Sequence, residues 1–367
     1  VAQSSWTTPS HASMMTGLTP AEHGLIYYEN PGKLGDDIPT LAGIMRDAGY
    51  ATAGFYGGAF LNPKFGLDRG FDVYQRGGKS FKENINLSIT WIKENSGRKF
   101  FLFLHGFDVH RPYNLSSEEN IFYDYNGTYD VSSFCLDEGN WPETDDEEEY
   151  VISQYDTGVR HADDLLGGFI RFLEDEGLME DTVVIITADH GKLFFEHEWC
   201  GHVSQVYEEA LHVPLIVRTP GSASKRIAGQ VPASISILPT VMGLAGIDAE
   251  VNKANSLQSF LESGHPAFEY IVSETGRGSP GNETRFKRSI RTEKWKLVYF
   301  RKENITSYFL FDLENDPREK EDKSGEYPQV FNEMKKLNER IKLGHAPSKA
   351  ELDEETIEQL KALGYLR

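Results

Sequence analysis

The sequence predicts an α/β fold: a large, mostly parallel sheet sandwiched by helices, followed by a small C-terminal α+β subdomain. Continuous apolar runs at 100–105, 183–187 and 213–217 alternate with segments of helical spacing, which is typical of a parallel sheet with helices on its faces. After residue 265 this alternation ends and strand-like segments follow one another. We therefore expect a large domain over 1–265 and a smaller one over 266–367.

The elements of the large domain follow in order. Residues 36–48 predict a helix with Ile38, Leu41 and Ile44 on one face, and Gly49 ends it. The spacing over 150–176 predicts another helix, whose inward positions are Val151, Tyr155, Val159, Ala162, Leu166 and Phe169. The other elements are strands at 51–56, 100–105, 183–187 and 213–217 and a helix at 235–246.

The smaller domain has a different pattern. Residues 289–300 and 308–313 predict an antiparallel pair of strands around Asn304, and two helices follow at 330–341 and 354–363. The acidic stretch 143–149, in the large domain, predicts a solvated loop or the start of a helix.

The composition excludes several classes of partner. The net charge of −20 argues against a nucleic acid or an anionic membrane as partner. No run of about 18 apolar residues exists, so nothing in the sequence predicts a membrane span. Cys135 and Cys200, the two cysteines, provide no disulfide framework, and whether they form one bridge stays open.

Five Asn-x-Ser/Thr sequons are compatible with export, although the pattern is common by chance; they lie at Asn86, Asn114, Asn126, Asn282 and Asn304. The chain begins at Val1 with no signal sequence, which makes a processed or truncated N-terminus an expectation.

The segment 7–17 carries the candidate nucleophile. Thr7 is a hydroxyl that needs a metal or a base for activation, and Pro9 suits the first turn of a helix, whose N-terminus favours anions. His11 can orient the oxygen of Thr7 or stabilise developing negative charge. A structural interpretation of Thr7 as a helix cap stays open, as does a structural role for His11.

Four further polar residues lie after predicted strands or a glycine. Asp189 and His190 come directly after a buried strand and combine a hard oxygen with an imidazole, which suits a divalent cation, although a plain strand-exit turn is an equal alternative. His110, in the loop after the strand at 100–105, and His202 can hold an oxyanion or protonate a leaving oxygen. Cys200 can be a ligand, but a buried structural thiol is the favoured interpretation.

With these residues in view, the chain resembles the sulfatase family of the alkaline phosphatase superfamily. The family signature is Cys or Ser, any residue, Pro-Ser-Arg, a few residues and Thr-Gly. Its places are taken here by Thr7, Pro9, Ser10, His11, Thr16 and Gly17. The resemblance continues in order along nearly the whole chain, as far as Leu363-Gly364-Tyr365.

The resemblance implies roles for these residues. It makes Asp189 and His190 metal ligands, with Thr7 at the same divalent ion, whether calcium, magnesium, manganese or zinc. It makes His110 and His202 contacts to the substrate anion. The substrate it implies is a small-molecule or glycan sulfate or phosphate ester.

Two departures from the family pattern matter. Relatives oxidise the Cys or Ser to formylglycine, whose second hydroxyl expels sulfate, and Thr7 offers no such hydroxyl. We therefore expect weak sulfatase activity of the usual kind and give phosphate and phosphonate esters equal weight. The family also begins with a strand that ends in paired aspartates, and this chain has no residues there. Either an N-terminal segment is missing or the site is incomplete, and we expect weak metal binding.

The sequence thus predicts a metal-dependent hydrolase of sulfate or phosphate esters with Thr7 as nucleophile. A phosphotransferase of the same superfamily is one alternative. A non-catalytic anion- or glycan-binding relative is another, which the absent aspartates favour.

Overall fold

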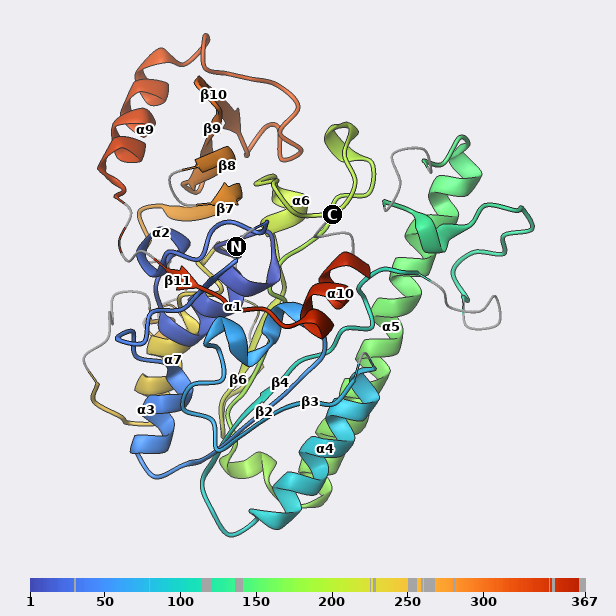
Figure 1. Ribbon diagram of the computed structural model, residues 1–367, viewed down its shortest axis with the longest axis vertical. Coiled ribbons are helices and arrows are strands. Elements are labelled where there is room, and N and C mark those ends of the chain that lie inside the picture. Colours follow the sequence, from blue (N-terminus) through green and yellow to red (C-terminus); the bar gives the residue numbers. More distant parts are fainter. Residues whose placement is uncertain are drawn as a thin grey trace. The chain divides into compact units, whose positions relative to one another are not determined.

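The computed structural model describes residues 1–362 except 30, 79, 114–119, 136–140, 225, 227–228, 250–255, 259, 261–267, 280–281, 343 and 345–346 (Figure 1). The chain forms two compact units, each discontinuous in sequence. The first unit comprises Val1–Ile44, Pro63–Gly70 and Val183–Asp353, and the second comprises Met45–Asn62, Phe71–Thr182 and Glu354–Arg367. The predicted fold class is confirmed: a parallel sheet with helices, and a C-terminal antiparallel sheet.

The second unit contains the parallel sheet, with strand order β3-β2-β4. Strand β2 (Ala51–Tyr56) is buried along its whole length and pairs in parallel with β3 (Val73–Arg76) and β4 (Phe100–Leu104). Helix α4 (Phe81–Glu94) packs against this sheet, with Trp91 edge-on to Phe100, and α5 (Asp145–Asp175) runs beside α4 (Figure 1). The C-terminal helix α10 (Glu354–Ala362) belongs to the same unit.

Helix α5 begins within the acidic stretch and confirms a helix start there. The side chain of Thr144 accepts a hydrogen bond from the Glu147 backbone N–H, and four acidic residues in the first turn suit the positive end of the helix. The predicted inward face is right for Val151 and Phe169, which are buried, but wrong for Val159, which is 44% exposed. A helix as long as α5 is covered by other parts of the protein along only part of its length, so its apolar stripe is not buried throughout.

The first unit begins with two short helices, α1 (Thr7–Thr16) and α2 (Pro20–His23). Its pair β5 (Val184–Thr187) and β6 (Leu215–Arg218) is antiparallel, whereas the sequence suggested membership of a mostly parallel sheet. The connection between them holds the four-residue helix α6 (Glu208–Leu211) rather than a crossover helix. Helix α7 (Ile237–Leu244) follows and contacts α1. The helix α3 (Leu41–Asp47) lies where residues 36–48 predicted it.

A four-stranded antiparallel sheet completes the first unit. Its order is β10-β9-β8-β7, and its strands are β7 (Ile271–Ser279), β8 (Asn282–Arg291), β9 (Trp295–Lys302) and β10 (Ile305–Asp312). Helix α9 (Pro328–Arg340) packs Met334 against Ile290, Leu297 and Leu310 of this sheet. A small antiparallel pair joins β1 (Gly32–Lys33) to β11 (Ser348–Lys349).

The predicted strand over 289–300 is wrong as a single strand. The chain turns between β8 and β9, where the Thr292 hydroxyl accepts from the Trp295 N–H at 2.9 Å. The antiparallel pair around Asn304 is confirmed as β9 and β10. The domain boundary at 265 and 266 stays a prediction, because it falls outside the described residues, as do Asn114 and Leu363-Gly364-Tyr365. Across the described residues, no helix is long and apolar enough to cross a membrane.

Candidate active site

The first turn of α1 carries the candidate nucleophile. Thr7 is the first residue of this helix, and Trp6, with extended backbone, precedes it. Thr7 is buried, with 9% of its surface exposed. The first N–H groups of a helix lack partners within it, so this end of α1 favours negative charge. A charge that develops on Oγ1 of Thr7 therefore forms where the backbone stabilises it.

The turn after β5 carries the candidate metal ligands, and α1 contacts this turn directly. The hydroxyl of Ser10 donates a hydrogen bond of 2.5 Å to the backbone O of Asp189, 179 residues later. Nδ1 of His11 lies 3.6 Å from Oδ2 of Asp189. These two contacts join the N-terminal segment and the Asp189 turn in one site within the first unit.

The histidines of this site share one hydrogen-bond pattern. Nδ1 of His190 lies 2.8 Å from the backbone O of Gly191, and Nδ1 of His202 lies 2.7 Å from that of Ser5. Because a carbonyl oxygen can only accept, Nδ1 carries the proton in each ring, and the neutral tautomer leaves Nε2 as the basic nitrogen. The two rings stack at 3.9 Å with 16° between their planes. Basic Nε2 atoms are what a metal ion or a substrate proton needs.

His11 is held in its neutral form. It is 3% exposed, and burial lowers the pKa of its imidazole, while the Asp189 carboxylate raises it by less. Its Nδ1 lies 2.9 Å from the backbone O of Thr7, which makes this nitrogen a donor. A neutral ring bonded to the backbone of Thr7 suits the role of orienting this residue.

His110 lies in the second unit, in the loop after β4. Its Nδ1 lies 2.7 Å from the backbone O of Arg111, and its ring stacks on Phe107 at 4.3 Å. Asp108, in the same loop, accepts from the N–H of Phe81 at 2.6 Å and so ties the loop to α4. His110 thus has the tautomer of His190 and His202, but the structure does not place it against Thr7.

The described residues fit a divalent cation only in part. Asp189 and His190 supply a carboxylate and an imidazole, and Nε2 of His190 lies 3.5 Å from Oδ2 of Asp189. No group of three or more His, Cys, Asp or Glu side chains with metal-binding geometry occurs within the described ranges. Two such ligands are fewer than a divalent ion takes in most protein sites, so a bound ion needs further oxygen ligands.

Gly191 fixes the path of the chain just after His190. Its N–H donates to the backbone O of Ala210 in α6 at 2.8 Å. A Cβ atom at this position would lie 2.1 Å from the backbone O of Glu209. The Asp189 turn is therefore pressed against α6, and the position of α6 sets the position of the turn.

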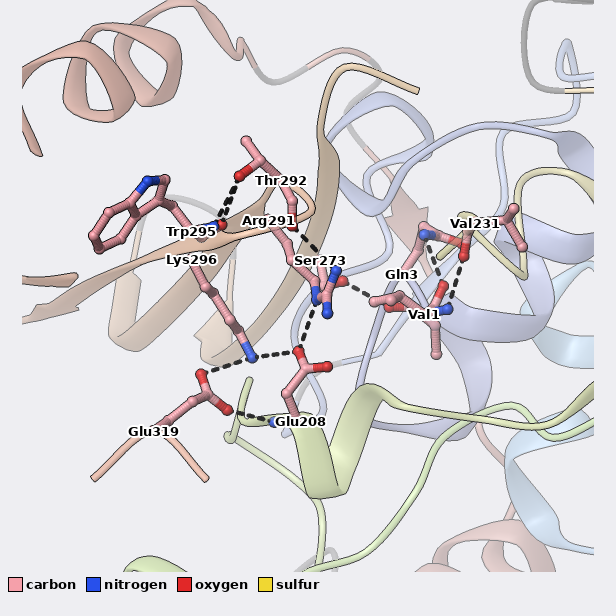
Figure 2. A network of polar contacts seen from close by, with 11 residues as sticks. Val1, Gln3, Glu208, Val231, Ser273, Arg291, Thr292, Trp295, Lys296 and Glu319 are labelled. Carbon is pink, nitrogen blue, oxygen red and sulfur yellow. Dashed lines mark hydrogen bonds and ion pairs between the residues drawn. The ribbon is translucent and has the colours of Figure 1, made fainter. Parts of the chain in front are cut away.

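A network of buried charges holds α6 in place (Figure 2). The carboxylate of Glu208 accepts from Lys296 at 3.0 Å and from Arg291 at 3.2 Å. Glu319 lies 2.8 Å from the ammonium of Lys296 and accepts from the backbone N–H of Glu208 at 2.6 Å. Burial opposes ionisation of Glu208, but Lys296 and Arg291 outweigh it and lower the pKa of this carboxyl to about 2. The antiparallel sheet thereby anchors the helix that supports the metal-ligand turn.

The interpretation of Cys200 as a buried thiol is wrong. Cys135 and Cys200 are both disulfide-bonded, and neither is a free thiol. A sulfur in a disulfide has no thiolate to offer, so Cys200 is no metal ligand here.

Sequence reasoning missed the supporting residues. Ser10 belongs to the family signature, but nothing in the sequence indicated that its hydroxyl binds the backbone of Asp189. Lys296, Arg291 and Glu208 are ordinary charges in sequence, and their burial was not foreseen. A single lysine among apolar residues of a strand, as Lys296 is between Trp295 and Leu297, is the signal that could have indicated its burial.

An α/β fold that brings a helix start with a buried hydroxyl together with an aspartate–histidine turn is typical of ester hydrolases. The comparison with known families agrees. Residues 1–247 match the sulfatase family, and residues 195–344 match the C-terminal region of N-sulphoglucosamine sulphohydrolase. The chain belongs to the sulfatase family of the alkaline phosphatase superfamily, a family of sulfuric- and phosphoric-ester hydrolases.

Among curated relatives, Arylsulfatase K of Xenopus laevis is 25% identical over 396 residues, which cover 89% of this chain and 72% of that protein. The chain spans only 50% to 53% of the bovine, rat and mouse proteins of the same name.

Two solved structures share the fold. One is a protein in complex with its substrate D-glucosamine-2-N,6-O-disulfate. The TM-score is 0.73 at 19% identity, and the match covers 98% of this chain and 90% of that one. The other is the phosphonate monoester hydrolase of Agrobacterium radiobacter, with TM-score 0.73, 18% identity, and 93% and 86% covered.

Proposed function

We propose that this chain hydrolyses sulfate or phosphate esters and that the hydroxyl of Thr7 is the nucleophile. The observation that carries the proposal is the contact between α1 and the Asp189 turn. At this contact the Ser10 hydroxyl donates to the backbone O of Asp189 at 2.5 Å, and Nδ1 of His11 lies 3.6 Å from Oδ2 of Asp189. This contact supports a common site for Thr7, Asp189 and His190.

In the proposed reaction, Oγ1 of Thr7 gives its proton to a basic Nε2 atom, that of His110 or His202, and attacks the sulfur or phosphorus atom of the ester. The bond from this atom to the ester oxygen breaks, and the histidine that took the proton returns it to that oxygen, which leaves as an alcohol. Water then attacks the same sulfur or phosphorus atom, which releases sulfate or phosphate and restores the threonine hydroxyl. His11 orients Thr7 through its backbone, and His202 contacts a substrate oxygen.

A divalent cation at Asp189 and His190 would neutralise the ester oxygens and lower the pKa of the Thr7 hydroxyl. The carboxylate of Asp189 suits calcium, magnesium and manganese, and the imidazole of His190 suits zinc, so we propose one of these four ions. Metal analysis of the purified protein tests the assignment. Asp189→Asn should lower the bound metal per chain, and an unchanged metal content would remove Asp189 from the ligand set.

The choice between sulfate and phosphate depends on Thr7. A sulfated threonine lacks the neighbouring hydroxyl through which a formylglycine hydrate expels sulfate, so only attack of water at sulfur clears it. We therefore propose that phosphate and phosphonate esters are turned over at least as well as sulfate esters. The similarity to a phosphonate monoester hydrolase supports testing both. Fast sulfate-ester hydrolysis by the unmodified protein, with phosphate esters untouched, would contradict this preference.

The nucleophile is tested with a panel of chromogenic sulfate, phosphate and phosphonate esters. Thr7→Ala should lower kcat by about a thousandfold or more, because no other hydroxyl replaces the attacking oxygen. Thr7→Ser keeps a hydroxyl at the same place and is the matched control. Intact-mass measurement during turnover should show one sulfuryl or phosphoryl group bound to wild-type protein and none bound to Thr7→Ala. Full activity of Thr7→Ala would overturn the proposal.

A non-catalytic anion- or glycan-binding role is the second candidate. The observation that favours it is that the described residues contain no group of three or more His, Cys, Asp or Glu side chains that could hold a metal ion. Such a protein should bind a sulfated sugar and leave every ester in the panel intact. The phosphotransferase alternative is separated by adding an acceptor alcohol, because a transferase converts the alcohol to its ester and a hydrolase does not.

A further inference from the structure

Resting on the proposed function, we propose that Lys287, Arg285 and Thr275 form a second anion subsite. It binds a negatively charged substituent, a carboxylate or a sulfate, on the alcohol part of the ester substrate. The three residues lie on one face of the β7–β8 pair, because Thr275 is directly opposite Lys287 and Arg277 is directly opposite Arg285.

Lys287 is the centre of this subsite, and no carboxylate balances its charge. Its ammonium donates to the amide oxygen of Gln205 at 2.6 Å and lies over the rings of Tyr207 and Phe300 at 5.8 and 5.3 Å. The described residues bring no carboxylate within ion-pair distance of it. Burial, followed by the charge of Arg285, lowers the pKa of Lys287 to about 8. A half-buried cation beside a second cation is costly unless an anion joins them.

Other buried cations of the same sheet differ from Lys287 in this respect. Arg288, on the opposite face of β8, pairs with Glu274 at 2.6 Å. Arg291, further along β8, pairs with Glu208, and Lys296 of β9 pairs with Glu208 and Glu319. These three buried cations are each paired with a carboxylate. Lys287 lacks this match, which indicates that its counter-ion comes from a ligand.

A buried hydroxyl on the same face supplies an independent sign of a ligand. Thr275 is fully buried, and its Oγ1 has no hydrogen-bond partner within the described part of the chain. A buried hydroxyl without a partner is uncommon in proteins. Because Thr275 is directly opposite Lys287, an anion bound by the ammonium can also accept from this hydroxyl.

The subsite is connected to the candidate active site through a short stretch of chain. Gln205, the partner of Lys287, lies three residues after His202, so their Cα atoms are at most about 11 Å apart. Tyr28 forms a second connection. Its ring lies 6.4 Å from that of Trp6, the residue before Thr7, and its backbone N–H donates to the backbone O of Gly276, the residue after Thr275, at 3.2 Å. A separation of this size between the subsite and the candidate active site suits a second charged group on a sulfated sugar.

The test compares a substrate with and without the second anion. Lys287→Met should raise KM for a disulfated glucosamine by about tenfold, because one charge-assisted contact is lost. We expect kcat for this substrate and KM for a simple aryl ester, which has no second anion, to stay unchanged. Lys287→Arg should restore most of the affinity. Lys335→Met is the matched control, because Lys335 also lies over two rings, Tyr308 and Phe331, but on α9. A sugar with one sulfate and one carboxylate decides which second anion is preferred.

Binding keeps the subsite testable even if hydrolysis fails. Calorimetry with D-glucosamine-2-N,6-O-disulfate should show about tenfold weaker binding to Lys287→Met than to wild type, with or without turnover. Equal affinity of the two proteins would overturn the subsite and leave the proposed hydrolysis intact. Lys287→Met should also unfold at the same or a higher temperature than wild type, since it removes an unbalanced buried charge. A clear loss of thermal stability would make Lys287 a structural residue instead.

Discussion

Gly191 is the position at which the Asp189 turn has no room for a side chain. Alanine here would place Cβ 2.1 Å from the backbone O of Glu209, so the turn or α6 must move. Gly191→Ala should lower the free energy of unfolding by about 1–3 kcal/mol and reduce kcat more than it raises KM. Gly325→Ala, with open space around its Cβ, is the control. Normal kcat in Gly191→Ala would show that the position of the turn does not limit the reaction.

Two buried histidines of the N-terminal segment make stability depend on pH. Burial lowers the pKa of His23 to about 3, and that of His11 is lowered for the same reason. The unfolded chain, with an ordinary histidine pKa of 6.5, therefore binds these protons first, so folding stability falls as pH drops from 6.5 towards 3.

His23 should cost about 1.4 kcal/mol per pH unit in that window. In His23→Gln the slope of the free energy of unfolding against pH should decrease by the contribution of one proton. Glutamine can replace the contacts of His23 to Ser13 and Leu25 without titrating. Urea unfolding across this pH range measures the slope. An unchanged slope in His23→Gln would mean that His23 is already accessible to protons in the folded state.

Single residues divide into those that the sequence could indicate and those that it could not. Thr7, His11 and Asp189 lie in motifs, where the residue type and its spacing are enough to suggest chemistry. Ser10 and Gly191 act through backbone atoms of segments far away in sequence, and no local pattern encodes such a partner. The orientation of a catalytic group is therefore less predictable than its identity.

The ion network makes α6 depend on the antiparallel sheet. Lys296 is fully buried between Glu208 and Glu319, at 3.0 and 2.8 Å. Lys296→Met leaves Glu319 without a counter-ion and Glu208 with Arg291 alone, and should lower the free energy of unfolding by about 3–5 kcal/mol. Because α6 supports the Asp189 turn, kcat should fall as well, while Lys296→Arg should recover part of both. Chemical denaturation and ester hydrolysis measure the two effects.

Lys294→Met is the matched control for Lys296→Met. Lys294 lies two residues earlier, is 42% exposed and pairs with Glu314 at the surface. Exposed pairs contribute little, so this variant should match wild type in stability and in kcat. If Lys296→Met and Lys294→Met had the same free energy of unfolding and the same kcat, burial of Lys296 would not contribute to either.

Secondary-structure elements were predictable where they depend on local pattern and not where they depend on partners. Strand β2 matches its predicted range, which lies between Gly49 and Gly57. The direction of β6 is set by how the chain returns from β5, and residue spacing contains no record of that path. The turn between β8 and β9 was missed because its residues are not typical turn formers.

The two compact units are discontinuous, which a reading along the chain cannot foresee. Residues Glu354–Arg367 join the second unit although they follow the antiparallel sheet of the first. One contact within that unit is the hydrogen bond of 3.1 Å from Asn62 to Thr356. Contacts of this kind join segments that are far apart in the sequence, and no local pattern encodes them.

The net charge of −20 opposes the approach of an anionic ester from a distance. Salt screens this repulsion, since the Debye length falls from about 30 Å at 0.01 M to about 8 Å at 0.15 M. Raising sodium chloride over this range should therefore increase kcat/KM for a singly charged aryl ester by about twofold and leave kcat unchanged. Initial rates across the series measure it, with glycerol as a control for viscosity. A fall in kcat/KM would instead show that cations near the site, such as Lys287 and Arg285, attract the substrate more strongly than the whole chain repels it.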